Sequence, residues 1–131
     1  MSGEKDLDRM LRHMEPHLNE GEYVFCTLPS GDINILKDNV VGWFREAEGV
    51  TVVLNRHTAD ELHLKYDFIA SWITLSVHSS LEAVGLTAAF SAALSKENIS
   101  CNVIAAYYHD HIFVNKADGE KALQVLKQLS I

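Results

Sequence analysis

The sequence has little positive charge, which excludes several kinds of partner. It contains 11 lysine and arginine residues against 18 aspartate and glutamate residues, so its net charge is −7. No stretch gathers enough basic side chains to neutralise the phosphates of a nucleic acid. An anionic membrane surface is disfavoured for the same reason. We therefore expect neither nucleic acid nor a membrane as a partner.

Long apolar runs are also missing. No stretch approaches the roughly 20 apolar residues that a membrane-spanning helix needs. The first residues, MSGEKDLDRML, are charged where a secretory signal would be apolar. Cysteine is scarce, and Cys26 and Cys101 each lie within an apolar run. We interpret them as buried thiols of a reducing compartment, with a disulfide or a reactive thiol as the alternative. The expected location is therefore cytoplasmic.

Motifs of catalysis are absent as well. The sequence contains no nucleophile elbow, no phosphate-binding loop and no paired-histidine metal motif. We therefore expect a protein that is not an enzyme and holds no cofactor. With 131 residues, the chain has room for one compact unit or for two very small units that share a core.

The first half of the sequence predicts two helices and three strands. Trp43 and Phe44 face the next apolar run across a turn-like tetrapeptide, which favours a β-hairpin with both aromatic rings in the core. A helix up to Ala47 is the alternative. Thr58 is the expected N-cap of the second helix. The predicted elements are a helix over residues 6–18, a strand over 22–28, the hairpin over 40–54 and a helix over 58–64.

The second half predicts a more regular pattern. Its predicted elements are a strand over residues 68–77, a helix over 86–96, a strand over 101–108, a tight turn over 109–111, a strand over 112–114 and a helix over 117–129. This β-α-β-β-α order gives five of the six elements of a ferredoxin-like βαββαβ unit. The missing last strand would leave an open sheet edge. Tyr23–Leu28 is a spare strand that could fill it.

These patterns predict an α+β protein built from two related units. The first half, residues 1–66, is interpreted as an eroded ferredoxin-like unit with a leading helix. The second half, residues 67–131, is the better-formed unit. We expect a shared or exchanged strand between the two, so neither half would fold by itself.

Several phrases of the sequence resemble the ACT domain, a small-molecule sensing module of amino-acid metabolism. HSSLEAVGLTAA and CNVIAAYYHDHIFV are similar to a group of small bacterial tandem ACT proteins, and the likeness extends through EYVFCTLPSG and FREAEGVTVVLN. The usual Asp-x-Pro-Gly of the ACT loop is replaced by Glu82-Ala-Val-Gly85. The resemblance implies ACT-type units, a free amino acid as ligand and a homodimer.

The loop before the predicted helix at Leu86 is the candidate ligand site. A helix start presents unpaired N–H groups and partial positive charge, which suits a carboxylate, and Gly85 permits close approach of the backbone. A capped helix with an ordinary turn is the alternative. Asn102, which the ACT resemblance places beside the pocket, either binds the ligand or satisfies neighbouring backbone groups. The candidate ligand-binding residues are Ser79, Ser80, Leu81, Glu82, Ala83, Val84, Gly85, Leu86 and Asn102.

Two other functions are compatible with the sequence. His109, Asp110 and His111, with His78 as a fourth group, could form a small metal-dependent enzyme site. An aspartate at a hairpin turn needs no metal to explain it, so we expect an ordinary turn and no bound metal. A purely structural interaction module is the second alternative. Our hypothesis is a non-catalytic protein that binds a free amino acid.

Overall fold

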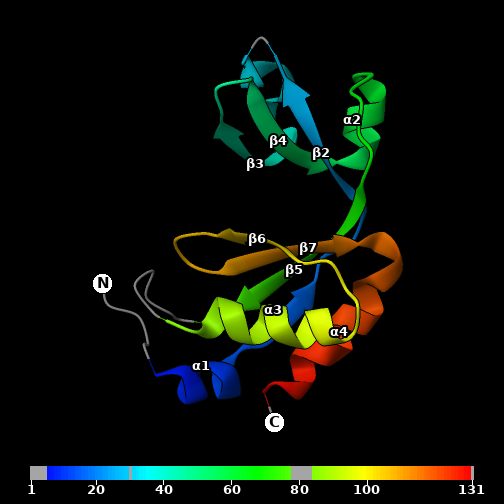
Figure 1. Cartoon of the computed structure of the whole chain (residues 1–131). Helices are drawn as coiled ribbons and strands as arrows, with labels where there is room; N and C mark the ends of the chain where they lie inside the picture. The colour runs from blue at the N-terminus through cyan, green and yellow to red at the C-terminus, as the bar shows by residue number, and fades with distance from the viewer. Residues whose placement is uncertain (1–5, 30, 78–83, 131) are drawn as a thin grey trace. The chain divides into compact units, whose positions relative to one another are not determined.

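The computed structural model describes residues 6–29, 31–77 and 84–130, and these form two compact units (Figure 1). Unit 1 combines the residues up to Glu20 with those from Ser71 onward, and unit 2 is Gly21–Ala70. This grouping differs from the boundary expected between residues 66 and 67, because the leading segment belongs with the second half of the chain.

Unit 2 has the element order of a ferredoxin-like unit. Its elements are β2 (Tyr23–Leu28), the 3-10 helix η1 (Ile33–Asn39), β3 (Val40–Arg45), β4 (Val50–Asn55), α2 (Arg56–Glu61) and the start of β5 (Ile69–Ser76). The strands lie in the order β3-β4-β2-β5. A 3-10 helix therefore occupies the place of the first helix, over residues for which the sequence pattern predicted no element.

The core of unit 2 follows from strand alternation. Every second residue of β2 points to the same face, and the antiparallel register pairs each of these residues with an apolar residue of β4. Leu36 from η1 and Ala59 from α2 are buried against this face. The paired core residues are Val24 with Leu54, Cys26 with Val52 and Leu28 with Val50.

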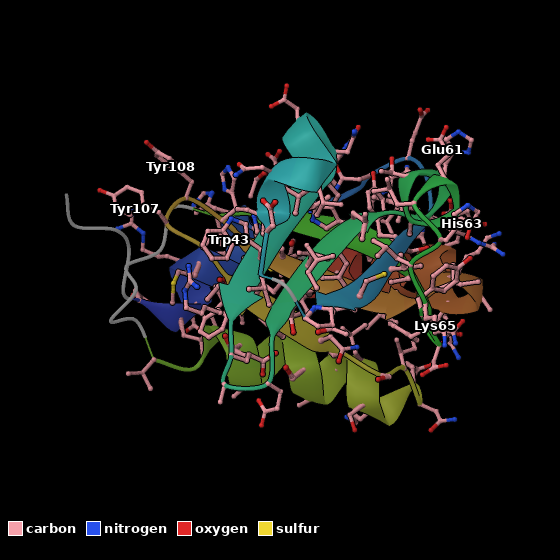
Figure 2. The ribbon with its side chains drawn as sticks, turned by 90° about the horizontal axis from the view of Figure 1, so that it is seen from above. Trp43, Glu61, His63, Lys65, Tyr107 and Tyr108 are labelled. Atoms are coloured by element: carbon pink, nitrogen blue, oxygen red, sulfur yellow. The ribbon has the colours of Figure 1, made fainter. Side chains whose placement is uncertain are left out.

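The predicted β3–β4 hairpin is confirmed, but the predicted burial of its aromatic residues is wrong. Glu46 and Gly49 close the turn with reciprocal backbone hydrogen bonds. Trp43 (Figure 2) is 46% exposed and Phe44 is 72% exposed. Because β3 is the outermost strand of this sheet, its side chains have a neighbouring strand on one side only.

Helix α2 begins earlier than predicted. The side chain of Asn55, not that of Thr58, caps it by accepting a hydrogen bond from the His57 amide at 2.8 Å. In unit 1, Asn115 plays the same part, since its Oδ1 accepts from the Ala117 amide at 3.0 Å. Each asparagine ends the strand that follows a hairpin, so the two units repeat the same strand-to-helix junction.

Unit 1 also contains the six elements of a ferredoxin-like unit, together with α1 and η2, but its strands come from two separate segments of the chain. Its sheet has the order β1-β5-β7-β6. The elements are α1 (Leu7–His13), β1 (Glu15–Leu18), most of β5, α3 (Leu86–Lys96), β6 (Asn102–Ala105), β7 (Asp110–Asn115), the 3-10 helix η2 (Lys116–Asp118) and α4 (Gly119–Gln128).

Strand β1 fills the sheet edge that the sequence left open. It pairs antiparallel with β5, from Glu15 opposite Ser76 to Leu18 opposite Ile73. The proposal that Tyr23–Leu28 fills this edge is therefore wrong. β2 instead pairs with the first two residues of β5 in unit 2. β5 is thus shared by both units, which confirms the ferredoxin-like fold with a shared strand.

The predicted helix over residues 6–18 is correct only in its first half. α1 ends at His13, and Met14 already has an extended backbone with φ −71° and ψ 128°. Pro16 has no N–H to donate and disfavours helical geometry in the residue before it, so the chain continues as a strand. An edge strand such as β1 tolerates a proline.

The core of unit 1 lies between its sheet and its helices α1, α3 and α4, which cover one face (Figure 1). The α3 prediction is confirmed at both ends. The buried core residues include Met10 and Met14 from the leading segment, Ile73 and Leu75 from β5, Phe90 and Leu94 from α3, Ile112 and Val114 from β7, and Leu126 from α4.

None of the helices in the described part of the chain is long and apolar enough to cross a membrane. Cys26 is a buried free thiol, as predicted, whereas Cys101 is a free thiol that is only partly buried, and burial raises the pKa of each.

The shared strand predicts how fragments of the chain behave. A fragment of residues 67–131 lacks β1 and the buried side chains of Met10 and Met14. Those two side chains alone contribute about 3–6 kcal/mol, comparable to the whole stability of a small domain. We expect this fragment to show no cooperative thermal transition by circular dichroism.

A permuted fragment is the matched control. Ser130 donates a hydrogen bond to the Met14 carbonyl at 2.7 Å, so the end of the chain lies beside the leading segment. We expect residues 71–131, joined by a flexible linker of about ten residues to residues 6–20, to melt cooperatively. Equal melting of both fragments would contradict the requirement for β1.

Candidate functional site

The start of α3 has the properties expected of an anion site. Gly85 is its N-cap residue, with a left-handed backbone at φ 99°, and no side chain among the described residues caps the helix. The first intrahelical bond runs from the Ala89 amide to the Gly85 carbonyl at 2.9 Å. The earlier amides of the first turn therefore have no intrahelical partner, and the helix dipole adds partial positive charge there.

The predicted loop residues are only partly within the described chain. Ser79, Ser80, Leu81, Glu82 and Ala83 lie outside the described residues. Of the rest, Val84 is 83% exposed, whereas the side chain of Leu86 is buried in the core of unit 1. Only the backbone of Leu86 could therefore contact a ligand.

Gly85 is closely packed as well as left-handed. A Cβ added to this residue would lie 3.3 Å from Cδ2 of Leu7 in α1. Any other residue at position 85 would therefore strain the backbone and press on α1. A test of ligand binding needs substitutions elsewhere in the loop.

Asn102 does not lie beside the start of α3 within unit 1. It begins β6 opposite Phe113, and its Nδ2 donates to the Phe113 carbonyl at 3.1 Å. Its side chain thus satisfies neighbouring backbone, one of the two roles that the sequence allowed. The β6–β7 hairpin and the start of α3 share one end of unit 1 (Figure 1), and Asn102 is at the other end of β6.

The predicted turn at residues 109–111 is displaced. The turn covers residues 106–109, closed by a bond from the Ala106 amide to the His109 carbonyl at 3.1 Å, and β7 begins at Asp110. Tyr107 and Tyr108 project from this hairpin (Figure 2) and are 61% and 70% exposed.

Strand alternation separates the residues of the suggested metal site. Asp110 is on the same side of β7 as Ile112 and Val114, which belong to the core, whereas His111 is on the opposite side. His111 and Asp110 therefore cannot converge on one ion. Among the described residues, no group of three or more His, Cys, Asp or Glu side chains is arranged to hold a metal.

His111 instead belongs to a polar network on the sheet face away from the helices. Trp72 Nε1 donates to His111 Nδ1 at 3.0 Å, and Thr74 Oγ1 lies 3.3 Å from the same nitrogen. Asn19 Nδ2 donates to Thr74 Oγ1 at 3.0 Å and to the Trp72 carbonyl at 3.2 Å. Because Nδ1 accepts from the indole, the proton of the neutral ring is on Nε2.

This network was not predicted, although the sequence contains a signal of it. Trp72 and Thr74 alternate with buried residues of β5, and His111 alternates with buried residues of β7. Polar side chains at every second position of two neighbouring strands point to a common face. The network fixes the end of β1 to β5 and β7 through side chains.

Asp110 is the buried acidic residue of the described chain. Its side chain is 8% exposed, and no hydrogen bond or ion pair to it is present among the described residues. Burial raises the pKa of its carboxyl group, and the nearby His109 opposes this shift. His109 has a fully buried Nδ1 that lacks a hydrogen-bond partner among the described residues. The hairpin thus carries one unsatisfied buried nitrogen beside a carboxylate that is largely buried but keeps some contact with solvent.

Two hollows lie elsewhere. One, of about 430 Å³, runs between α3 and α4 and is lined by residues such as Lys96, Lys121 and Leu129. The other, of about 400 Å³, lies in unit 2 at the start of α2. There Arg56 donates to Glu22 Oε1 and to the Tyr66 hydroxyl, each at 2.9 Å, and these bonds hold the guanidinium group in place.

The Trp72–His111 bond predicts a pH dependence of stability. Burial, and then the charge of His109, lower the pKa of His111 in the folded chain. At neutral pH both the folded and the unfolded chain keep this ring neutral. As pH falls below the usual histidine pKa, the unfolded chain takes up the proton first, so stability is lost until the folded pKa is passed.

We expect wild type to lose about 1 kcal/mol more stability than His111→Asn between pH 7.5 and 5, roughly the net value of one hydrogen bond. Asparagine provides an acceptor that does not titrate. Urea unfolding followed by tryptophan fluorescence measures the difference, and the other histidines are common to both proteins. Parallel pH curves would show that His111 does not titrate as described.

Two family models for the ACT domain match the chain, one over residues 2–71 and the other over residues 68–128. The two matches meet near residue 70 of the sequence. In the structure, however, the residues up to Glu20 belong to unit 1, together with those from Ser71 onward. The chain matches none of the curated proteins with which it was compared.

Solved structures extend this likeness. A Vibrio cholerae protein of unknown function, described as a possible transport protein, is 46% identical with a TM-score of 0.87, covering 97% of this chain and 98% of its own. A putative C-terminal regulatory domain of aspartate kinase from Porphyromonas gingivalis is 15% identical with a TM-score of 0.61, covering 92% and 99%. Clostridium acetobutylicum aspartate kinase is 15% identical with a TM-score of 0.63, covering 90% and 34%. The chain belongs to the ACT-domain family and carries two ACT units in tandem.

Proposed function

We propose that the protein is a non-catalytic regulatory sensor that binds a small molecule, a free amino acid. The observation that carries this proposal is the start of α3, where a left-handed glycine leads into a helix that no side chain in the described part of the chain caps. Its place in an ACT unit supports the same role, and regulatory domains of aspartate kinases share the fold.

The proposed binding step is electrostatic. Loop residues 79–86 receive the ligand's carboxylate, which meets the free amides and the positive end of the α3 dipole. Ser79 and Ser80 offer hydroxyl groups. Asn102 is too far along β6 to join this loop in its own unit, so we place it in the pocket of a second copy. Its Oδ1 accepts no hydrogen bond among the described residues.

The proposed output is a change in assembly. Each unit has an outermost strand with one unpaired edge, β3 in unit 2 and β6 in unit 1, and such edges accept a further strand. In a homodimer, a ligand that contacts both copies would stabilise one arrangement over others by its differential affinity. A separate partner protein would then recognise that arrangement.

A melting screen against the twenty amino acids at neutral pH tests the proposal. A ligand at about 100 times its Kd adds about 2.7 kcal/mol to the folded state, which raises Tm by several degrees for a chain of this size. We expect at least one amino acid to do so. No shift with any of them would favour a purely structural interaction module.

Paired serine variants test the loop. Ser79→Ala/Ser80→Ala removes two hydroxyl groups from the proposed site, and Ser95→Ala/Ser100→Ala removes two from exposed positions of the same unit. We expect isothermal titration to show weaker binding for the first variant by about tenfold, the value of one or two hydrogen bonds, and unchanged binding for the second. Equal affinities would remove the loop hydroxyls from the mechanism.

A further inference from the structure

Asp110 lowers the folding stability of the ligand-free protein. An ionised carboxylate that is buried without a hydrogen-bond partner destabilises the fold, because it loses its hydration without compensation. Asp60, by contrast, is exposed to solvent and accepts a hydrogen bond from Tyr66 at 2.7 Å. Asp110 is 8% exposed, so it keeps only a small contact with solvent.

The fold itself does not require an acid at this position. In each unit the strand pair next to the hairpin turn is equivalent, Arg45 with Val50 in unit 2 and Ala105 with Asp110 in unit 1. Val50 is buried in the core of unit 2 with 3% exposure. An apolar side chain therefore fits the equivalent position of the same fold. The packing of the fold does not explain why unit 1 has an aspartate there.

The strands next to Asp110 provide no positive partner. β5 and β6 carry no charged side chains, and the only charged residue of α3 is Lys96 at its far end. The charge of the neighbouring His109 acts on the carboxyl group, but no hydrogen bond or ion pair joins these two side chains among the described residues. No basic side chain of β5, β6 or α3 therefore neutralises the carboxylate of Asp110.

The position of Asp110 relates it to the proposed ligand. It lies on the helix-facing side of β7, at the hairpin end of the strand, and α3 starts at this same end of unit 1 (Figure 1). The uncapped amides of α3 favour an anionic group, and a desolvated carboxylate favours a cationic one. The two features together suit a ligand that carries both charges.

We propose that Asp110 binds a cationic group of the ligand, either an ammonium or a guanidinium group. This inference rests on the proposed function and gives the chemical class of its ligand: an amino acid bound with its carboxylate toward α3 and a positive group toward β7. Asp110 is then a specificity residue that remains destabilising until the ligand arrives.

The test combines stability with binding in the full-length chain. Asp110→Asn removes the charge with little change of shape, and Asp110→Val installs the residue that unit 2 uses at the equivalent position. Glu120→Gln is the control, since it removes one acidic charge from an exposed position of the same unit. Thermal melts without ligand, and titrations with each of the twenty amino acids, are compared across the four proteins.

We expect both Asp110 variants to melt at a higher temperature than wild type without ligand, because a buried charge has been removed. We also expect them to bind the amino acid that binds wild type about tenfold or more weakly, while Glu120→Gln behaves as wild type. A wild-type response to amino acids with neutral side chains assigns the α-ammonium group to Asp110. A response limited to lysine or arginine assigns the side-chain cation.

Two results would overturn the inference in distinguishable ways. If wild type binds an amino acid and both Asp110 variants bind it equally well, Asp110 is not a specificity residue, although the sensor function stands. A lower melting temperature for both variants would also overturn it, because Asp110 would then support the fold itself. If wild type binds no amino acid, the sensor function and this inference fail together.

Discussion

The pairing of β1 with β5 is the constraint on which unit 1 depends. β5 uses its first two residues to complete the sheet of unit 2 and the rest to begin the sheet of unit 1. The fourth strand of unit 1 therefore comes from the segment that precedes unit 2 in the chain. Met10 and Met14, which come just before that strand, lie in the same core as residues of α3 and α4. One strand, β5, thus contributes to both ACT units.

Local patterns predicted the elements whose burial follows from their own sequence. The alanine-rich segment after Gly85 forms α3 over the predicted residues, and the β3–β4 hairpin turns at the predicted tetrapeptide. The failures came where tertiary pairing overrides spacing. Residues 15–18 continue a helical pattern of apolar residues, but Pro16 and a free edge of β5 make them a strand. Trp43 looked like a core residue because periodicity does not reveal which strand is outermost.

The candidate site was predictable only in its backbone. A glycine before an apolar helix indicates a helix start that could accept an anion, and Gly85 has that geometry. The role of Asp110 depends on the register of β7. A turn over residues 109–111 would have exposed its carboxylate, whereas a turn that closes at His109 places it on the core side of the strand. A displacement of one residue along a strand reverses the face of every side chain, and sequence patterns do not locate turns with that precision.

The exchange of the leading segment also sets the order in which the chain can fold during synthesis. Unit 2 is complete once Ala70 has left the ribosome, because all of its strands lie between Gly21 and that residue. β1 precedes unit 2, yet its partner strand follows more than fifty residues later, and Ser130, which bonds the Met14 carbonyl, comes later still. Contacts so distant in sequence form slowly and leave apolar surface exposed in the meantime. Until β5 and the helices of unit 1 have been synthesised, the nascent protein therefore carries α1 and β1 as an unpaired amphipathic arm, a segment suited to chaperone binding.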